Sequence, residues 1–227
     1  MEPSVGIAHY WAQGDEITHV VAYLLLLMSL VSWYFILSKA WTALRIRQSS
    51  GALEAFWKAP SLDDAVKVLA NVDHEKVYAP LAMHGIEAAN VGTHAGSLNA
   101  ASDPGELITR TLRREITRAT SRLEGGLTIL ASVGATAPFV GLLGTVWGIY
   151  HALEAVSLAG TVQIDKVAGP VGESLIMTAL GLTVAIPAVL AYNAFTRVNR
   201  VTLAELDAFA HDIHAHLTTG ARVGKSE

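Results

Sequence analysis

Three long apolar runs divide the sequence, at residues 17–37, 127–153 and 171–195. Each is long enough to cross the hydrocarbon core of a bilayer as an α-helix, which takes about 20 residues. The stretches between and after these runs are polar enough to lie in water. The pattern predicts an all-α membrane protein with three transmembrane helices and long helical extensions in water.

Start and stop signals predict further helices in the polar stretches. Ser61 lies three residues before Asp64, and Asp103-Pro-Gly-Glu106 combines a cap, a proline and an acid, so both segments are typical helix starts. Residues 90–102 are rich in Gly, Ala and Ser and predict a flexible connection. Gly125-Gly126 predicts the point where the helix from Asp103 bends or enters the membrane.

Two of the predicted aqueous helices are amphipathic. The first has an apolar stripe made of Leu112, Ile116, Ala119 and Leu123. Its arginines lie mostly off that stripe, and a solvated face near a membrane is a better interpretation of them than an RNA-binding surface. They are Arg110, Arg113, Arg114, Arg118 and Arg122. The tail has Leu203, Leu206, Phe209, Ala210 and Ile213 at helical spacing, which predicts that the third span continues as an amphipathic helix.

Positive charge predicts the orientation of the spans. With the N-terminus outside, the outer segments hold only Lys166 of the 16 Lys and Arg residues. Basic residues gather on the cytoplasmic side of membrane proteins, so the C-terminus is expected inside. The predicted order is an outer N-terminus at 1–16, a first span at 17–37, a cytoplasmic helical domain at 38–126, a second span at 127–153, an outer turn at 154–170, a third span at 171–195, and a cytoplasmic helix and tail at 196–227.

Composition narrows the function classes. Charged residues make up 16% of the chain, against about 25% in a typical soluble domain. The absence of cysteine excludes disulfides, thiolate metal sites and a cysteine nucleophile. A net charge of −4 without a strongly basic face gives no reason to expect nucleic acid. The N-terminus has no basic region before its first apolar run, so no cleavable signal peptide is expected.

Small residues recur inside the second and third spans. Glycines at 134, 141, 144 and 148 lie three, four or seven residues apart, and Gly181 belongs to a similar stripe on the third span. Such spacing lets two helix backbones approach closely, because lipid provides no hydrophobic drive for helix association. We expect Gly134, Gly141, Gly144, Gly148 and Gly181 to serve helix packing and no chemical step.

Glu173 is the only Asp, Glu, Lys, Arg or His within the third apolar run. A charge inside a bilayer costs about 2.5–3.5 kcal/mol on insertion scales, so such a residue indicates a functional site. Near the outer end of a helix, however, an acid also stabilises the helix N-terminus, and position alone leaves both interpretations open. Thr145 and Thr178 are candidates to line a polar path with it, or each simply bonds a carbonyl of its own helix.

Two stretches resemble the ExbB/TolQ/MotA proton-channel family. They are Ala137-Pro-Phe-Val-Gly-Leu-Leu-Gly-Thr-Val-Trp-Gly-Ile149, and Ala168-Gly-Pro-Val-Gly-Glu-Ser-Leu-Ile-Met-Thr-Ala-Leu-Gly-Leu182 with Ala185-Ile-Pro-Ala-Val-Leu-Ala-Tyr-Asn193. The specific motif covers residues 131–195, and Ser32-Trp-Tyr-Phe-Ile-Leu-Ser-Lys39 brings the likeness closest to the ExbB branch. Ser174 and Met177 depart from the alanines more usual around the glutamate.

The resemblance implies a function and a set of partners. The family's essential glutamate falls on Glu173, and its two pore threonines fall on Thr145 and Thr178. ExbB-like proteins form a pentamer in the bacterial inner membrane around an ExbD-like single-span protein, which supplies the proton-carrying aspartate. The assembly uses the proton gradient to energise TonB for uptake of iron siderophores, haem or vitamin B12. The N-terminus is then periplasmic, and neither a cofactor nor a metal is implied.

Three alternatives stay open at this stage. A TolQ-like subunit of the Tol-Pal system is poorly separated by sequence. An intramembrane enzyme lacks support, because no paired carboxylates, serine–histidine spacing or metal motif lies in a span. In the tail, His211-Asp-Ile-His214-Ala-His216 places only His211 and His214 on one helical face, so a solvated tail is favoured over a metal site. A purely structural scaffold would tolerate loss of the Glu173 charge.

Overall fold

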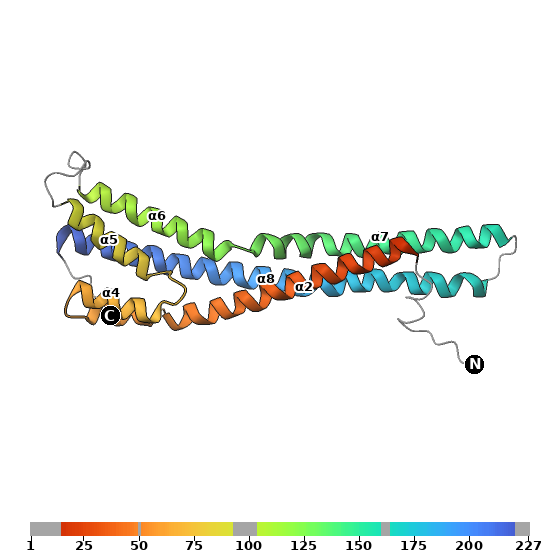
Figure 1. The fold of residues 1–227 in the computed structure, drawn as a ribbon, viewed down its shortest axis with the longest axis horizontal. Helices are drawn as coiled ribbons and strands as arrows, with labels where there is room; N and C mark the ends of the chain where they lie inside the picture. Colours follow the sequence, from red (N-terminus) through yellow and green to blue (C-terminus); the bar gives the residue numbers. More distant parts are fainter. Residues whose placement is uncertain (1–14, 50, 93–103, 160–163, 221–227) are drawn as a thin grey trace. The chain divides into compact units, whose positions relative to one another are not determined.

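The computed structural model describes residues 15–49, 51–92, 104–159 and 164–220, and every element in these ranges is an α-helix. In chain order the helices are α2 (Glu16–Ser49), α3 (Ala52–Lys58), α4 (Leu62–Val72), α5 (Ala79–Gly92), α6 (Pro104–Glu124), α7 (Leu127–Ala159) and α8 (Ile164–Thr219) (Figure 1). Within the described ranges, three helices are long and apolar enough to cross a membrane. The predicted all-α fold with three apolar spans is confirmed.

The three long helices extend past the apolar runs. α2 continues to Ser49, α7 continues to Ala159, and α8 is a single helix from Ile164 to Thr219. Much of the stretch expected as an outer turn, 154–170, is therefore helical. Where the membrane boundaries fall along these helices stays a prediction. The expected flexible connection falls largely on residues 93–102, and these, like the cap residue Asp103, lie outside the described residues.

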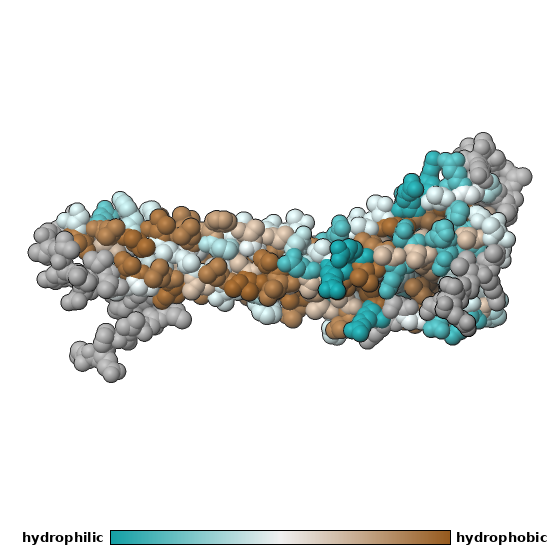
Figure 2. Space-filling model, turned by 180° about the vertical axis from the view of Figure 1, so that it is seen from behind, coloured by the Kyte–Doolittle hydropathy of each residue, from teal (hydrophilic) through white to brown (hydrophobic). Residues whose placement is uncertain are grey.

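One compact unit comprises residues 1–37 and 126–194. Here the first part of α2, all of α7 and the first part of α8 pack around a narrow apolar cluster made of Val21, Leu25, Val133, Ala137, Met177, Val184, Ala185 and Ala188. Large apolar side chains point outwards, including Leu30, which is 61% exposed, and Phe139, which is 71% exposed. Figure 2 shows such residues gathered over the visible surface of these helices. A surface of this kind is unfavourable in water and suits lipid or a neighbouring helix.

The second compact unit comprises residues 38–125 and 195–227. α3 to α6 and the last parts of α2 and α8 surround a core in which Leu69, Tyr78, Leu81 and Leu206 are fully buried. The amphipathic stripes predicted for α6 and α8 face this core, and the arginines of α6 are exposed. Ser61 caps α4 as predicted, since its Oγ accepts a hydrogen bond from the amide of Asp64 at 3.2 Å.

The end of α6 is held by side chains from two other helices. Lys39 of α2 and Asn199 of α8 both donate hydrogen bonds to the carbonyl oxygen of Leu123, each at 2.8 Å. These bonds satisfy a carbonyl that has no partner within its own helix. Gly126 follows with a φ of 82°, a conformation that glycine adopts at little cost. The helical conformation is therefore interrupted at Gly125-Gly126, as the sequence predicts.

Candidate functional site

The backbones of α7 and α8 meet at two glycines. A Cβ atom added to Gly141 would lie 2.5 Å from the carbonyl oxygen of Met177 and 3.1 Å from the Cα of Gly181. A Cβ added to Gly181 would lie 2.7 Å from the carbonyl oxygen of Ala137. Because the clashing atoms belong to the backbone, no side-chain rotation relieves them. The two helices approach each other as closely as they do only because both positions lack a side chain.

The other three glycines also lie where helices meet. Gly134 contacts Val189 of α8, and Gly148 contacts the side chain of Ser174. Gly144 lies between two helices: an added Cβ would be 3.0 Å from Val21 of α2 and 3.1 Å from Met177 of α8. The small residues of α7 therefore bring α8 against one side of the helix and α2 against another.

The two candidate threonines form a hydrogen-bonded pair within this packed region. The Oγ1 atoms of Thr145 and Thr178 are 2.5 Å apart, and Thr145 also donates to the carbonyl oxygen of Gly141 at 3.1 Å. The carbonyl has no proton to give, so both contacts are hydrogen bonds together when Thr145 donates to the carbonyl and Thr178 donates to Thr145. Thr145 is buried, with 5% of its surface exposed, whereas Thr178 is partly exposed. The oxygen of Thr178 therefore keeps acceptor sites for a further group.

Glu173 lies on α8, five residues before Thr178, and its side chain is outside the part of the chain that the structure describes. The adjacent residues are described. Ser174 is 3% exposed, donates to the carbonyl oxygen of Pro170 at 2.8 Å and packs against Gly148. Met177 is fully buried between α7 and α8. The role of Glu173 consequently stays a prediction.

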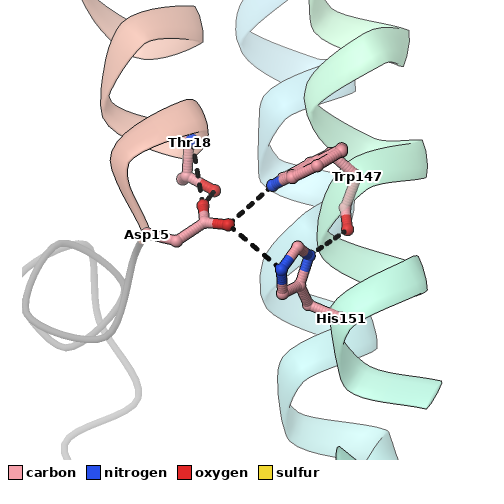
Figure 3. A network of polar contacts seen from close by, with 4 residues as sticks. All are labelled: Asp15, Thr18, Trp147 and His151. Carbon is pink, nitrogen blue, oxygen red and sulfur yellow. Dashed lines mark hydrogen bonds and ion pairs between the residues drawn. The ribbon is translucent and has the colours of Figure 1, made fainter. Parts of the chain in front are cut away.

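A second polar network lies at the start of α2 and was not identified from the sequence (Figure 3). Asp15 accepts a hydrogen bond from Nε1 of Trp147 at 2.6 Å and lies 3.6 Å from Nε2 of His151. Its other carboxylate oxygen accepts from the amide and the hydroxyl of Thr18, at 3.0 and 2.7 Å. The only available sequence signal was the Asp-to-Thr spacing of a helix cap, which says nothing of α7.

Burial raises the pKa of Asp15. Hydrogen bonds from Thr18 and Trp147 lower it by more, and His151 adds a smaller favourable interaction, so the pKa lies below its ordinary value. Asp15 therefore carries its charge at neutral pH.

Sequence reasoning also missed the buried polar groups of the second unit. Asp73 is 3% exposed and accepts hydrogen bonds from the backbone amides of Val77, Tyr78 and Ala79, at 3.0, 2.7 and 2.7 Å. Glu115 is 5% exposed and pairs with Arg118 and with His84. Asp73 caps the start of α5 from outside the usual cap position, and Glu115 lies on the helix face otherwise predicted to be apolar.

The tail histidines form no metal site among the residues that the structure describes. No group of three or more His, Cys, Asp or Glu side chains is arranged to hold a metal ion there. His214 is instead 3.1 Å from the hydroxyl of Thr109 on α6. His216 stacks edge-on against Trp57 with ring centroids 5.9 Å apart.

Comparison with known proteins identifies the family. Residues 73–208 match the MotA/TolQ/ExbB proton channel family, and this match spans more than half of the chain. The chain belongs to the MotA/TolQ/ExbB proton channel family. Thr145, Thr178 and all five packing glycines lie inside the matched region, while Asp15 lies outside it.

Full-length relatives carry the name ExbB. The chain is 44% identical over 216 residues to a Biopolymer transport protein ExbB of Xanthomonas campestris pv. campestris, covering 92% of the chain and 85% of that protein. It is 41% identical over 210 residues to the protein of the same name from Neisseria meningitidis, covering 90% and 93%. A Tol-Pal system protein TolQ of Haemophilus influenzae is 30% identical over 211 residues, covering 88% and 89%. The chain is thus more similar to these two ExbB-named proteins than to this TolQ protein.

Proposed function

We propose that the chain is the energy-transducing subunit of an inner-membrane motor driven by the proton-motive force, with the role of an ExbB protein. It energises a TonB-like protein for uptake of iron siderophores, haem or vitamin B12 across the outer membrane. The observation that carries the proposal is the 44% identity to an ExbB protein along 92% of the chain. The hydrogen-bonded pair of Thr145 and Thr178 inside the packed spans supports a proton-linked role.

The proposed arrangement is a ring of copies in the bacterial inner membrane. In this arrangement the spans are 17–37, 127–153 and 171–195, with the N-terminus in the periplasm and the C-terminus in the cytoplasm. The distribution of Lys and Arg supports this orientation. Five copies surround an ExbD-like single-span protein. Apolar faces that the single chain leaves uncovered support such an assembly, and they include Phe139 and Val146 of α7 and Leu175, Ile186 and Leu190 of α8.

The proposed mechanism assigns few polar points to a largely apolar pore. The partner's carboxylate loses its charge on protonation and can then pass the apolar wall of the ring. Glu173 and the threonine pair provide the polar groups that it meets. The oxygen of Thr178 uses a remaining acceptor site to accept a hydrogen bond from the protonated carboxyl, and Thr145 holds Thr178 in place. The driving bias is the membrane potential, about 2.3 kcal/mol per charge per 100 mV.

The deciding experiment removes the charge of Glu173 and keeps the size and shape of the side chain. Glu173→Gln should abolish TonB-dependent uptake and proton flux in reconstituted vesicles, while ring assembly stays intact. Glu124→Gln, which changes an exposed glutamate at the end of α6, is the matched control and should behave as wild type. Normal uptake and flux in the Glu173 variant would contradict this role and favour a structural scaffold.

A TolQ-like role is the second candidate, because the chain is also 30% identical to a Tol-Pal system protein TolQ over most of its length. The two roles differ in the single-span partner. Co-purification with an ExbD-like protein supports the proposal, and co-purification with a TolR-like protein supports the alternative.

A further inference from the structure

One carboxylate joins the start of α2 to the last turns of α7 (Figure 3). Asp15 directly precedes α2, and its Oδ1 caps that helix by accepting from the amide and hydroxyl of Thr18. Its Oδ2 accepts from Trp147 at 2.6 Å and lies 3.6 Å from His151, both of which belong to α7. The two oxygens therefore have separate tasks, one within α2 and one between helices.

The imidazole of His151 lies between two acceptors. Its Nε2 faces the carboxylate of Asp15, and its Nδ1 is 3.4 Å from the carbonyl oxygen of Trp147, four residues earlier on α7. A neutral imidazole has one N–H group and can donate to only one of these oxygens. The doubly protonated ring donates from Nδ1 to the carbonyl and at the same time places a positive charge beside the carboxylate.

We propose that Asp15 and His151 form a proton-binding latch between α2 and α7. Binding of a proton from the aqueous phase to His151 closes the latch, and its release leaves Trp147 as the only bond from α7 to the carboxylate. The site shares no residue with the threonine pair, although both lie in the same unit.

The surroundings allow the latch to exchange protons with water. The side chains of His151 and Asp15 are 43% and 37% exposed. Other titratable groups on the same turns are Glu16 and His19 of α2 and Tyr150 and Glu154 of α7. The first turns of α8 carry Asp165, Lys166 and Glu173, whose side chains lie outside the described residues. The hydrogen bonds to Asp15 keep its pKa low, so the carboxylate stays charged over the range in which a histidine changes charge.

The latch acts on α7, which already packs closely against α2 and α8. Gly144 of α7 packs against Val21 of α2, and Gly148 packs against Ser174 of α8. Closing the latch holds the end of α7 against α2 and so sets how far its last turns can move from α2. In the orientation of the proposed function, the latch faces the periplasm and responds to the proton concentration there. The assignment to the periplasm rests on the proposed function.

The test measures the distance between α2 and α7 as a function of pH. Because the chain has no cysteine, Val20→Cys and Leu153→Cys provide the only two labelling sites, and both positions are exposed. Full-length labelled protein, diluted into an excess of unlabelled chain and reconstituted in lipid nanodiscs, is examined by double electron–electron resonance. The ratio of short to long distances should rise about two- to fivefold between about pH 8 and pH 5, as an exposed ion pair predicts.

Three variants isolate the latch. His151→Gln should give the same distances at both pH values. Asp15→Asn should do the same while keeping the helix cap, because asparagine caps as well as aspartate does. His74→Gln changes an exposed histidine outside this unit and should keep the full response. Helix content and elution volume verify that each variant is folded.

Two outcomes overturn the proposal. The first is a pH-independent distance in the wild type, and the second is a response that survives in His151→Gln or in Asp15→Asn. The measurement needs neither a partner protein nor uptake. A flat response therefore rejects the latch alone, whereas normal uptake in Glu173→Gln rejects the proposed function alone.

Discussion

The Oγ1 atoms of Thr178 on α8 and Thr145 on α7 are 2.5 Å apart, and Thr145 Oγ1 lies 3.1 Å from the carbonyl oxygen of Gly141. Because the carbonyl has no proton, the arrangement that satisfies both contacts has Thr145 donating to Gly141 and Thr178 donating to Thr145. The two residues are consequently unequal. Thr145 is the buried support, and Thr178 presents an oxygen with free acceptor sites.

Valine substitutions should separate these two roles. Thr145→Val removes the acceptor of Thr178 and should lower the free energy of unfolding by about 1 kcal/mol. Thr178→Val leaves Thr145 bonded to Gly141 and should cost less. Under the proposed function both variants lower proton flux in reconstituted vesicles. Thermal unfolding in detergent measures the first difference, and a pH-sensitive dye inside the vesicles measures the second.

Serine substitutions are the controls for the threonine pair, because they keep the hydroxyl and remove only a methyl group. Thr145→Ser and Thr178→Ser should retain proton flux. Equal stability of the two valine variants would contradict the assigned direction of the hydrogen bonds.

Alanine at the closest helix contact should disrupt the packing of α7 against α8. Gly141→Ala and Gly181→Ala each place a Cβ against backbone atoms, and overpacking of this kind costs about 1–3 kcal/mol or more. Gly172→Ala on α8 is the matched control, because a Cβ there meets nothing within 4 Å. The control should be neutral or slightly stabilising, since alanine favours a helix over glycine. Melting temperatures of the three variants in one detergent decide the matter, and an equal effect at all three positions would contradict the packing described.

Local patterns predicted much of this fold. The apolar runs predicted the three long helices. Ser61 predicted the start of α4, and Gly125-Gly126 predicted the break between α6 and α7. The apolar stripe in the tail predicted that α8 continues past its apolar run. Each of these features depends on residues a few positions apart along one helix, where spacing determines which side chains share a face.

Contacts between distant segments were beyond the sequence patterns. Asp15 reaches Trp147 across 132 positions, and Tyr78 reaches Glu205 across 127. Nothing in the local sequence of either partner indicates the other. Among the candidate site residues, the threonines were selected from a family resemblance, and only the structure reveals that they bond each other. The assignment of Glu173 as a site residue depends on the family resemblance and on the energetic cost of a charge in the membrane.

Loss of the Asp73 carboxylate should destabilise the second unit. Asp73→Ala leaves three backbone amides at the start of α5 without their acceptor, and burial makes such groups costly, at about 1–3 kcal/mol. Asp207→Ala removes an exposed carboxylate from α8 and should change stability by less than about 0.5 kcal/mol. Limited proteolysis of α5 and thermal unfolding compare the two variants. Equal proteolysis rates would show that the carboxylate is dispensable for α5.

Tyr78 should make the stability of the second unit sensitive to alkaline pH. Burial raises the pKa of Tyr78, and the carboxylates of Glu205 and Asp73 raise it further. A tyrosine in the unfolded chain ionises at about pH 10. Above that pH the unfolded chain therefore loses a proton that the folded chain retains. The stability contributed by neutral Tyr78 is therefore complete below about pH 10 and falls as the pH rises further.

Tyr78→Phe tests this dependence because phenylalanine fills the same site and does not ionise. At neutral pH the variant loses the hydrogen bond to Glu205, 3.2 Å long, and should be about 1 kcal/mol less stable than wild type. Above about pH 10, ionisation of Tyr78 stabilises the unfolded wild type and so lowers its free energy of unfolding. The variant has no such ionisation, so the gap should narrow or reverse. A gap for Tyr78→Phe that stays constant with pH would mean that the phenol ionises as readily in the folded protein as in the unfolded chain.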